Sequence, residues 1–484
     1  MTRTYRRCKL MHAANAELIA KYLAGELDAA DDDGGIGNQE QTAGGLSLDH
    51  EQTSVYKKIM VQAQWSVEAL QQRDAVWQAY LREEAGGGDW NYVPGTDHAF
   101  ALRGPAGSGK STVVEHVIWK MRELGARILI ACPTGKLSSS YRQRWEGVTI
   151  DTVHGAFCLY KAEAEATDVM RAFDLIIVDE IGQLSMKTFE RLMRLWRAAD
   201  KLPTLVLLGD FCQLPGFEVE RPFHSPLWRS AELHLLHLRQ MRRCKCAKLK
   251  WKLELLRQFQ PTKTQLRAIL KGHRSPPVGY YEDPSHKIIT EFVVRGVYEN
   301  GPKDTLFLTI TRSAAALLNA HALEYFFGRI APQKIVPADP EAHLNNYVGS
   351  KMTGTAPSRL PLYVGLRVVL TRNRDKANDF VNGMGATVTQ IARKGVYVRT
   401  DSGRQLCVYP MTDDNRVTYY PLRLGYATTL HKVQGATLRH ITIWLDIPNV
   451  PGAAYVALSR VSLDQQWRFI GGLSVHHFKP VLDW

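Results

Sequence analysis

The stretch AFALRGPAGSGKSTVVEHVIWKMREL, residues 99–124, decides the fold of the first half of the chain. Its apolar start, residues 99–102, lacks the period-two alternation of a half-exposed strand and predicts a buried strand. Its end predicts a helix with one apolar face, because apolar residues recur at three- and four-residue spacing: Val113, Val114, Val117, Ile118, Met121 and Leu124. The glycine-rich segment between them therefore joins a strand to the N-terminus of a helix.

That segment carries the complete GxxxxGKS pattern of a phosphate-binding loop. Its glycines let the backbone curl so that N–H groups face phosphates, Lys110 supplies a positive charge to the β and γ phosphates, and the Ser111 hydroxyl is a ligand for Mg²⁺. A chance glycine-rich turn would lack this strand and helix context. The predicted cofactors are ATP and Mg²⁺, and the predicted nucleotide-binding residues of the loop are Gly104, Pro105, Ala106, Gly107, Ser108, Gly109, Lys110, Ser111 and Thr112.

Two further apolar runs end in polar residues suited to ATP hydrolysis. LIIVDE, residues 175–180, ends in Asp179, which we expect to hold Mg²⁺, and Glu180, which we expect to polarise the attacking water. LVLLGDFCQ, residues 205–213, leads to Gln213, which is expected to contact the γ phosphate. Each would be an ordinary strand end or loop residue on its own, and the upstream phosphate loop favours the functional interpretation.

Strands alternate with amphipathic helices through most of the chain, which predicts an α/β fold with parallel, helix-covered sheets. A second α/β series runs through three apolar runs: DTLFLTIT (304–311), LRVVLTRN (366–373) and HITIWLD (440–446). Short alternating strands with glycine turns between Gly385 and Pro421 predict a small β-barrel, SH3-like, inserted in this second part. The predicted boundaries are 1–45 for an N-terminal helix and acidic linker, 46–238 and 239–484 for two domains, and about 380–422 for the insertion.

Composition narrows the class of partner. The 484 residues exceed one ordinary core, and the net charge of +13 favours a polyanionic partner, with nucleic acid first, over a merely basic surface. The seven scattered cysteines are typical of reduced thiols in an intracellular protein, and no metal site beyond the nucleotide magnesium is expected. No apolar run approaches the ~20 residues of a membrane span. The N-terminal segment is not a secretory signal, and its acidic stretch argues against a mitochondrial presequence.

Seven motifs occur in order along the chain: GPAGSGKST (104–112), ACPTGK (131–136), IDTVHGAF (150–157), LIIVDEIGQLS (175–185), LLGDFCQLP (207–215), YATTLHKVQGATL (426–438) and YVALSRV (455–461). Together they resemble the motifs of superfamily 1 helicases, closest to the Pif-one/RecD-like branch, over about residues 46–475. The resemblance implies two RecA-like domains, ATP hydrolysis between them and translocation on single-stranded DNA, commonly 5′ to 3′.

The same resemblance implies further nucleotide-site residues. Gln52 resembles the glutamine that recognises adenine, although its distance from Gly104 implies an insertion around residues 65–95. Gly435 and Arg460 resemble the second-domain glycine and arginine that approach the γ phosphate. The family's other arginine lies within LHLRQMRRCK (236–245), where we favour Arg242, and Arg239 and Arg243 compete for the role. The alternatives for this basic cluster are contact with a nucleic-acid backbone and a solvated helix start.

The family's strand-contacting motifs contain six residues that hold the predicted nucleic-acid track: Thr134, His154, Phe157, Thr429, His431 and Lys432. Hydroxyl, imidazole and ammonium groups can bind phosphates, and Phe157 can stack on a base, with a place in the core as the alternative. The predicted partners are single-stranded DNA and its junctions with duplex, bound by a monomer. The alternatives are an RNA helicase, a translocase that does not unwind, a degenerate nucleic-acid-binding scaffold and a small-molecule kinase, for which the Arg460 motif has no use.

Overall fold

The computed structural model describes residues 47–81, 99–199, 203–214, 220–230, 233–275, 289–339, 358–413 and 416–481. These form two compact units, an N-terminal unit (47–243) and a C-terminal unit (244–481), and the division falls after Arg243 rather than after Leu238. The predictions for residues 1–45 lie outside the described residues. Within the described part of the chain, no helix is both long enough and apolar enough to cross a membrane.

A six-stranded parallel sheet organises the N-terminal unit, with the strand order β3-β2-β4-β5-β1-β6. Its strands are β1 (Ala99–Arg103), β2 (Ile128–Cys132), β3 (Thr149–Thr152), β4 (Leu175–Val178), β5 (Thr204–Gly209) and β6 (Leu233–His237). Alternate residues of β2, β4 and β5 enter two separate hydrophobic clusters, one on each face of the sheet. Both faces are therefore buried, which explains why these strands are continuous apolar runs.

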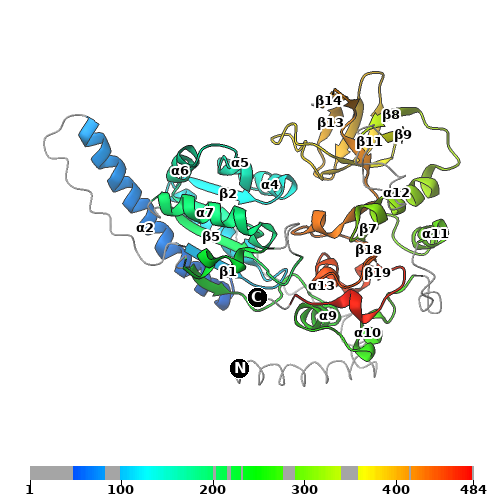
Figure 1. Ribbon diagram of the computed structural model, residues 1–484, viewed down its shortest axis with the longest axis horizontal. Helices are drawn as coiled ribbons and strands as arrows, with labels where there is room; N and C mark the ends of the chain where they lie inside the picture. Colours follow the sequence, from blue (N-terminus) through cyan, green and yellow to red (C-terminus); the bar gives the residue numbers. More distant parts are fainter. Residues whose placement is uncertain are drawn as a thin grey trace. The chain divides into compact units, whose positions relative to one another are not determined.

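Helices cover both faces of this sheet, and the long helix α2 packs against α3 and β5 (Figure 1). The apolar face predicted from Val113 to Met121 is buried in α3, whereas Leu124 is exposed just beyond the helix end. The helices of the unit are α2 (His50–Leu81), α3 (Lys110–Glu123), α4 (Gly135–Arg142), α5 (Val153–Ala156), α6 (Glu163–Arg171), α7 (Met186–Ala198) and α8 (Pro226–Ser230), with 3-10 turns η1 (Ile181–Gln183) and η2 (Pro222–His224).

The C-terminal unit also contains a parallel sheet, with the order β17-β7-β18-β19. Two parallel α/β sheets confirm the predicted RecA-like fold class. The strands are β7 (Leu306–Thr309), β17 (Ala427–Thr429), β18 (Ile441–Trp444) and β19 (Trp467–Phe469). The helices and turns are α9 (Ala247–Gln258), α10 (Lys263–Leu270), α11 (Glu291–Glu299), α12 (Arg312–Phe327), α13 (Ala453–Leu458), η5 (Leu430–Val433), η6 (Asp464–Gln466) and η7 (Val475–Phe478).

An antiparallel module is inserted between α12 and β17. Its five-stranded sheet has the order β13-β12-β11-β10-β16, and two strand pairs, β8-β9 and β14-β15, accompany it. The strands are β8 (Lys334–Ala338), β9 (Ser358–Leu362), β10 (Arg367–Leu370), β11 (Gly385–Ile391), β12 (Val396–Thr400), β13 (Gln405–Val408), β14 (Met411–Thr412), β15 (Thr418–Tyr419) and β16 (Leu422–Leu424). The module thus begins well before residue 380, and closure into an SH3-like barrel stays a prediction.

Assigning LRVVLTRN to the second parallel series was wrong. Strand β10 lies in this stretch and pairs antiparallel with both β11 and β16. Val368 and Leu370 point into the core of the inserted module together with residues of β8 and β9. A central strand of a small antiparallel module is as apolar as a strand of a parallel sheet, so the sequence pattern could not separate the two.

A buried charge cluster fastens α9 and α10 to the end of the C-terminal unit. The Lys252 ammonium is fully buried and lies 2.8 Å from both carboxylate oxygens of Asp464. His273 Nε2 lies 3.0 Å from Asp464 Oδ2, and its ring stacks on Trp467 at 3.6 Å. Burial alone would raise the pKa of Asp464, but the His273 hydrogen bond and the Lys252 charge outweigh burial and lower it to about 2.

We predict that Asp464→Leu lowers the free energy of unfolding by about 3–5 kcal/mol, because Lys252 is left buried without its counter-charge. The double variant Lys252→Met/Asp464→Leu removes both charges and should regain most of that loss in urea unfolding at pH 7. The Asp464 pKa is about 2 in the fold against 3.8 for the free side chain, so the pair's contribution is complete above the higher value and is lost as pH falls toward the lower one. A stable single variant would contradict this role.

Candidate nucleotide site and nucleic-acid interface

The predicted residues of the N-terminal unit collect at one edge of its sheet. All six strands are parallel, so their carboxyl ends share that edge, which is where ligands bind in open α/β sheets. The phosphate loop follows β1, Thr134 follows β2 and His154 follows β3. Asp179 and Glu180 follow β4, Gln213 follows β5 and the arginine cluster 239–243 follows β6.

The phosphate loop has the backbone geometry that its glycines predict. Gly107 and Gly109 have φ values of 72° and 84°, in the left-handed region that favours glycine. Helix α3 begins at Lys110, so its first N–H groups and the positive end of its dipole face the loop. The Lys110 ammonium donates to the carbonyls of Gly104 at 2.8 Å and Pro105 at 3.1 Å, and so lies within the curl of the loop.

Tyr141 connects the two predicted magnesium ligands. Its hydroxyl, on α4, donates to Asp179 Oδ2 at 2.7 Å, and both residues are buried. Burial, then the Asp179 charge, raises the pKa of Tyr141, against a hydrogen bond with Ser111 that lowers it. Burial also raises the pKa of Asp179, against the Tyr141 hydrogen bond and the Lys110 charge. The Ser111 hydroxyl and the Asp179 carboxylate both contact the Tyr141 hydroxyl. Both are hard oxygen ligands, so they fit Mg²⁺.

Glu180 and Gln213 stand at the ends of adjacent strands. Glu180 has φ 50°, a left-handed conformation uncommon for a residue with a side chain and typical of functional sites. Its backbone N–H donates to Asp179 Oδ1 at 2.8 Å, which orients the Asp179 carboxylate. Gln213 is buried, and its N–H donates to the Asp210 carbonyl at 3.1 Å.

Gln52 lies against the phosphate loop at the start of α2. Asp49 and Gln52 form reciprocal caps, since each side-chain oxygen accepts the other residue's backbone N–H, at 3.0 and 3.2 Å. The Gln52 amide nitrogen lies 3.5 Å from the Gly109 carbonyl. Helix α2 continues to Leu81, which accounts for much of the extra chain between Gln52 and Gly104.

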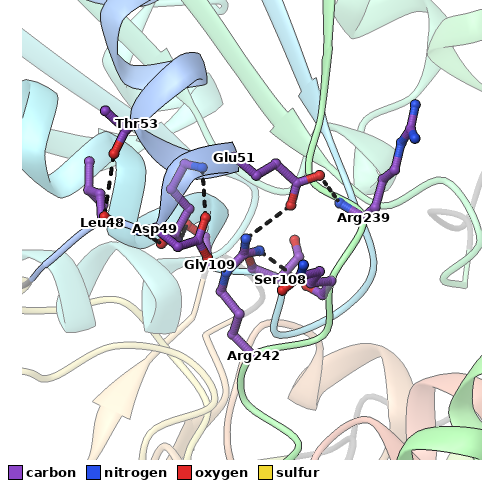
Figure 2. Close-up of polar contacts among 10 residues, drawn as sticks. Leu48, Asp49, Glu51, Thr53, Ser108, Gly109, Arg239 and Arg242 are labelled. Carbon is purple, nitrogen blue, oxygen red and sulfur yellow. Dashed lines mark hydrogen bonds and ion pairs between the residues drawn. The ribbon is translucent and has the colours of Figure 1, made fainter.

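Arg242 has contacts different from those expected of a residue that reaches a γ phosphate. Its guanidinium pairs with Asp49 and Glu51 on one side and donates to the Ser108 carbonyl at 2.7 Å on the other (Figure 2). Arg239 is exposed, and its side chain points away from this cluster. The sequence could not foresee the pairing, because Asp49 and Glu51 lie almost two hundred residues earlier and carry no motif.

In the C-terminal unit, Arg460 and Gly435 lie side by side in one loop system. Arg460 is buried, and its guanidinium donates to the carbonyls of Val433 at 3.3 Å and Ala436 at 3.4 Å, on either side of Gly435. Gly435 has φ 78°. These contacts show Arg460 bracing the loop that carries Gly435, and its role at the γ phosphate stays a prediction.

The prediction that Phe157 stacks on a base was wrong. Its ring is fully buried in the hydrophobic cluster beneath α5, where it fills the core rather than facing solvent. Thr134 and His154 are exposed at the sheet edge, and the Thr134 hydroxyl also caps α4 by accepting from the Leu137 N–H. Tyr160 is 76% exposed three residues after Phe157 and is the aromatic side chain that faces solvent there.

A basic pocket in the C-terminal unit adds residues that the motifs did not indicate. It lies between α12, β9, β16 and β17, and its lining includes Thr429 and Lys432 of the predicted track. Three arginines from the inserted module and α12 also line it: Arg312, Arg359 and Arg423. His431 is half-buried beside Lys432 but is not part of the lining. These arginines are far apart in sequence, so only the fold brings them together.

Comparisons with known proteins agree with this geometry. A family model described as an AAA domain matches residues 92–273. The ATP-dependent DNA helicase PIF6 of Trypanosoma brucei brucei is 26% identical over 410 residues, covering 74% of this chain and 49% of that protein. The chain spans 49% of the length of PIF6 and 59% and 58% of the rat and human PIF1 helicases.

Solved Pif1 helicases have a similar fold. A structure of Pif1 helicase from Bacteroides with ADP-AlF3 and single-stranded DNA has a TM-score of 0.57 at 21% identity, covering 79% of this chain and 91% of that one. A Pif1 helicase structure that concerns DNA unwinding at forked duplex DNA has a TM-score of 0.60 at 18% identity. The match covers 90% of this chain and 94% of that one. Fold and site define a nucleotide-binding protein with a phosphate loop and two RecA-like units. The chain is therefore similar in sequence and in fold to Pif1 helicases.

The Tyr141 contact gives a testable result. Tyr141→Phe keeps the buried ring but removes the donor to Asp179, so we expect the free energy of unfolding to fall by about 1.5–3 kcal/mol, the range for hydrogen bonds to charged groups. Urea unfolding measures the loss, and Tyr160→Phe, which alters an exposed ring, is the matched control. Equal stability of the two variants would mean that the Asp179 contact contributes nothing.

Proposed function

We propose that the chain is an ATP-dependent helicase that translocates on single-stranded DNA from 5′ to 3′ and unwinds duplex. The observation that carries the proposal is the single sheet edge at which Lys110, Asp179 and Glu180 lie beside Thr134 and His154. ATP chemistry and strand contact would share one row of loops, so a strand bound there can alter the geometry of hydrolysis.

Within the proposed mechanism, each residue of the ATP site has a separate task. Lys110 and the N–H groups of the loop bind the phosphates, and Glu180 orients and accepts a proton from the attacking water. Ser111 and Asp179 would hold Mg²⁺, which would neutralise negative charge on the phosphates. Gln213 would contact the γ phosphate, and Gly435 and Arg460 would act from the C-terminal unit.

The proposed nucleic-acid track combines both units. Thr134 and His154 would contribute from the N-terminal unit, and Thr429, His431 and Lys432 from the C-terminal one. We add Arg312, Arg359 and Arg423, because four basic side chains around one pocket suit a phosphate backbone. The proposed partners are single-stranded DNA and its junctions with duplex. The proposed working form is a monomer, since one chain carries both units.

Glu180→Gln tests the proposal. It should bind ATP normally and hydrolyse it about 10²–10⁴ times more slowly, the usual contribution of a general base. ATP turnover is measured with and without saturating single-stranded DNA, and with single-stranded RNA in a parallel series. Wild type should be stimulated by DNA, and Glu123→Gln, which alters an exposed pair on α3, should match it. Wild-type turnover that DNA does not stimulate, or normal turnover in Glu180→Gln, would refute the proposal. Stimulation by RNA and not by DNA would mean that the substrate is RNA.

The basic pocket gives a second test. Arg423→Ala and Lys432→Ala should each weaken binding to all sequences similarly and reduce the slope of log affinity against log salt concentration by about 0.7, the value for one single-strand phosphate contact. Fluorescence anisotropy with oligothymidine and a mixed-sequence strand measures both effects. Lys120→Ala, which removes an exposed lysine paired with Glu123 on α3, is the control. An unchanged slope in both pocket variants would exclude the pocket from the track.

A further inference from the structure

The segment that follows β6 runs along the phosphate loop and is tied to its tip. The backbone N–H groups of Arg242 and Arg243 both donate to the Gly107 carbonyl, at 2.8 and 2.9 Å. A Cβ atom built on Gly107 would lie 2.4 Å from the Arg243 Cβ, so the two backbones are in close contact. The backbone of Arg242 is therefore coupled to the conformation of the phosphate loop independently of the Arg242 side chain.

The Arg242 side chain joins this loop to the start of α2. Its guanidinium donates to the carboxylates of Asp49 and Glu51, the latter at 3.0 Å, and to the Ser108 carbonyl at 2.7 Å (Figure 2). A planar guanidinium can hold three acceptors in a fixed arrangement, which a lysine ammonium cannot reproduce. The hydrogen bond from Arg242 lowers the pKa of Asp49, which favours the charged carboxylate that Arg242 binds.

Arg242 is linked through Asp49 to the contact between Gln52 and Gly109. Gln52 is buried, and a Cβ atom on Gly109 would come within 2.3 Å of its amide nitrogen. Asp49 caps α2 and bonds Gln52 reciprocally, so the acceptor of Arg242 belongs to the same turn as Gln52. Movement of that turn would therefore displace Gln52 from Gly109 and change the conformation of the phosphate loop.

A role for Arg242 at the γ phosphate does not fit these contacts. The guanidinium would have to leave two carboxylates and a carbonyl, and the side chain is only 20% exposed. Arg239, in the same segment, is exposed and is bonded to Glu51 only through its backbone N–H, at 2.9 Å. The side chain of Arg239 can therefore change without disturbing the cluster.

We propose that Arg242 is a positioning residue that holds the phosphate loop and the Gln52 turn of α2 in their nucleotide-binding arrangement. Its loss weakens the binding of nucleoside diphosphates and triphosphates alike, and leaves turnover at saturating ATP largely intact. The inference rests on the proposed ATP site, and it differs from an arginine that acts on the transferring phosphate, whose loss lowers turnover and leaves the diphosphate bound.

The test measures binding of a fluorescent ADP with Mg²⁺, ATP turnover and melting temperature on the same proteins. Arg242→Gln should weaken ADP binding about tenfold, equivalent to about 1.4 kcal/mol. Arg242→Lys should recover little of the loss because it lacks the planar fork. Arg239→Gln is the matched control in the same segment and should leave ADP affinity unchanged.

A double-variant cycle separates this role from a general loss of stability. Glu51→Gln should weaken ADP binding in the same sense, and Glu51→Gln/Arg242→Gln should cost less than the sum of the two single changes, because both remove one contact. Additive effects would overturn the inference. So would normal ADP affinity with reduced turnover, or a lower melting temperature with normal affinity and turnover. Failure of wild type to bind ADP would instead refute the ATP site itself.

Discussion

The parallel pairing of the N-terminal sheet is the constraint on which the site depends. Six strands running in one direction bring the loops that follow them to one edge, although those loops are spread over more than a hundred residues of sequence. Burial of both faces then fixes the register, since a one-residue shift of β2, β4 or β5 would exchange residues between two different hydrophobic clusters. The sheet thereby brings the proposed residues for ATP hydrolysis and for strand contact to the same edge.

Hydrogen bonds connect several of these loops to one another. Tyr141 on α4 reaches the carboxylate after β4, and α4 is capped by Thr134, a residue of the proposed nucleic-acid track. Arg242 after β6 reaches the loop after β1 and the start of α2. In the C-terminal unit, Arg460 braces the loop of Gly435 from within. Each is a short physical connection through which a change at one loop can alter another.

The sequence predicted what depends on local pattern. The phosphate loop, strands β1, β2, β4 and β5 and the buried face of α3 follow from spacing and apolar runs. What it could not predict depends on long-range packing: Phe157 is core because α5 lies over a hydrophobic cluster, and β10 is antiparallel because of partners to which no motif points. The Asp49 and Glu51 pairing of Arg242 and the arginines of the basic pocket are of the same kind.

We propose that the chain uses ATP to move along one strand of DNA and to separate it from the other. Unwinding of duplexes that carry a 5′ or a 3′ single-stranded tail measures this most directly, with Lys110→Ala as the ATP-site control. We expect wild type to separate the 5′-tailed duplex in an ATP-dependent manner, and we expect no separation by Lys110→Ala or of a blunt duplex. Separation of neither tailed duplex at saturating ATP, or equal separation by Lys110→Ala, would contradict the proposal.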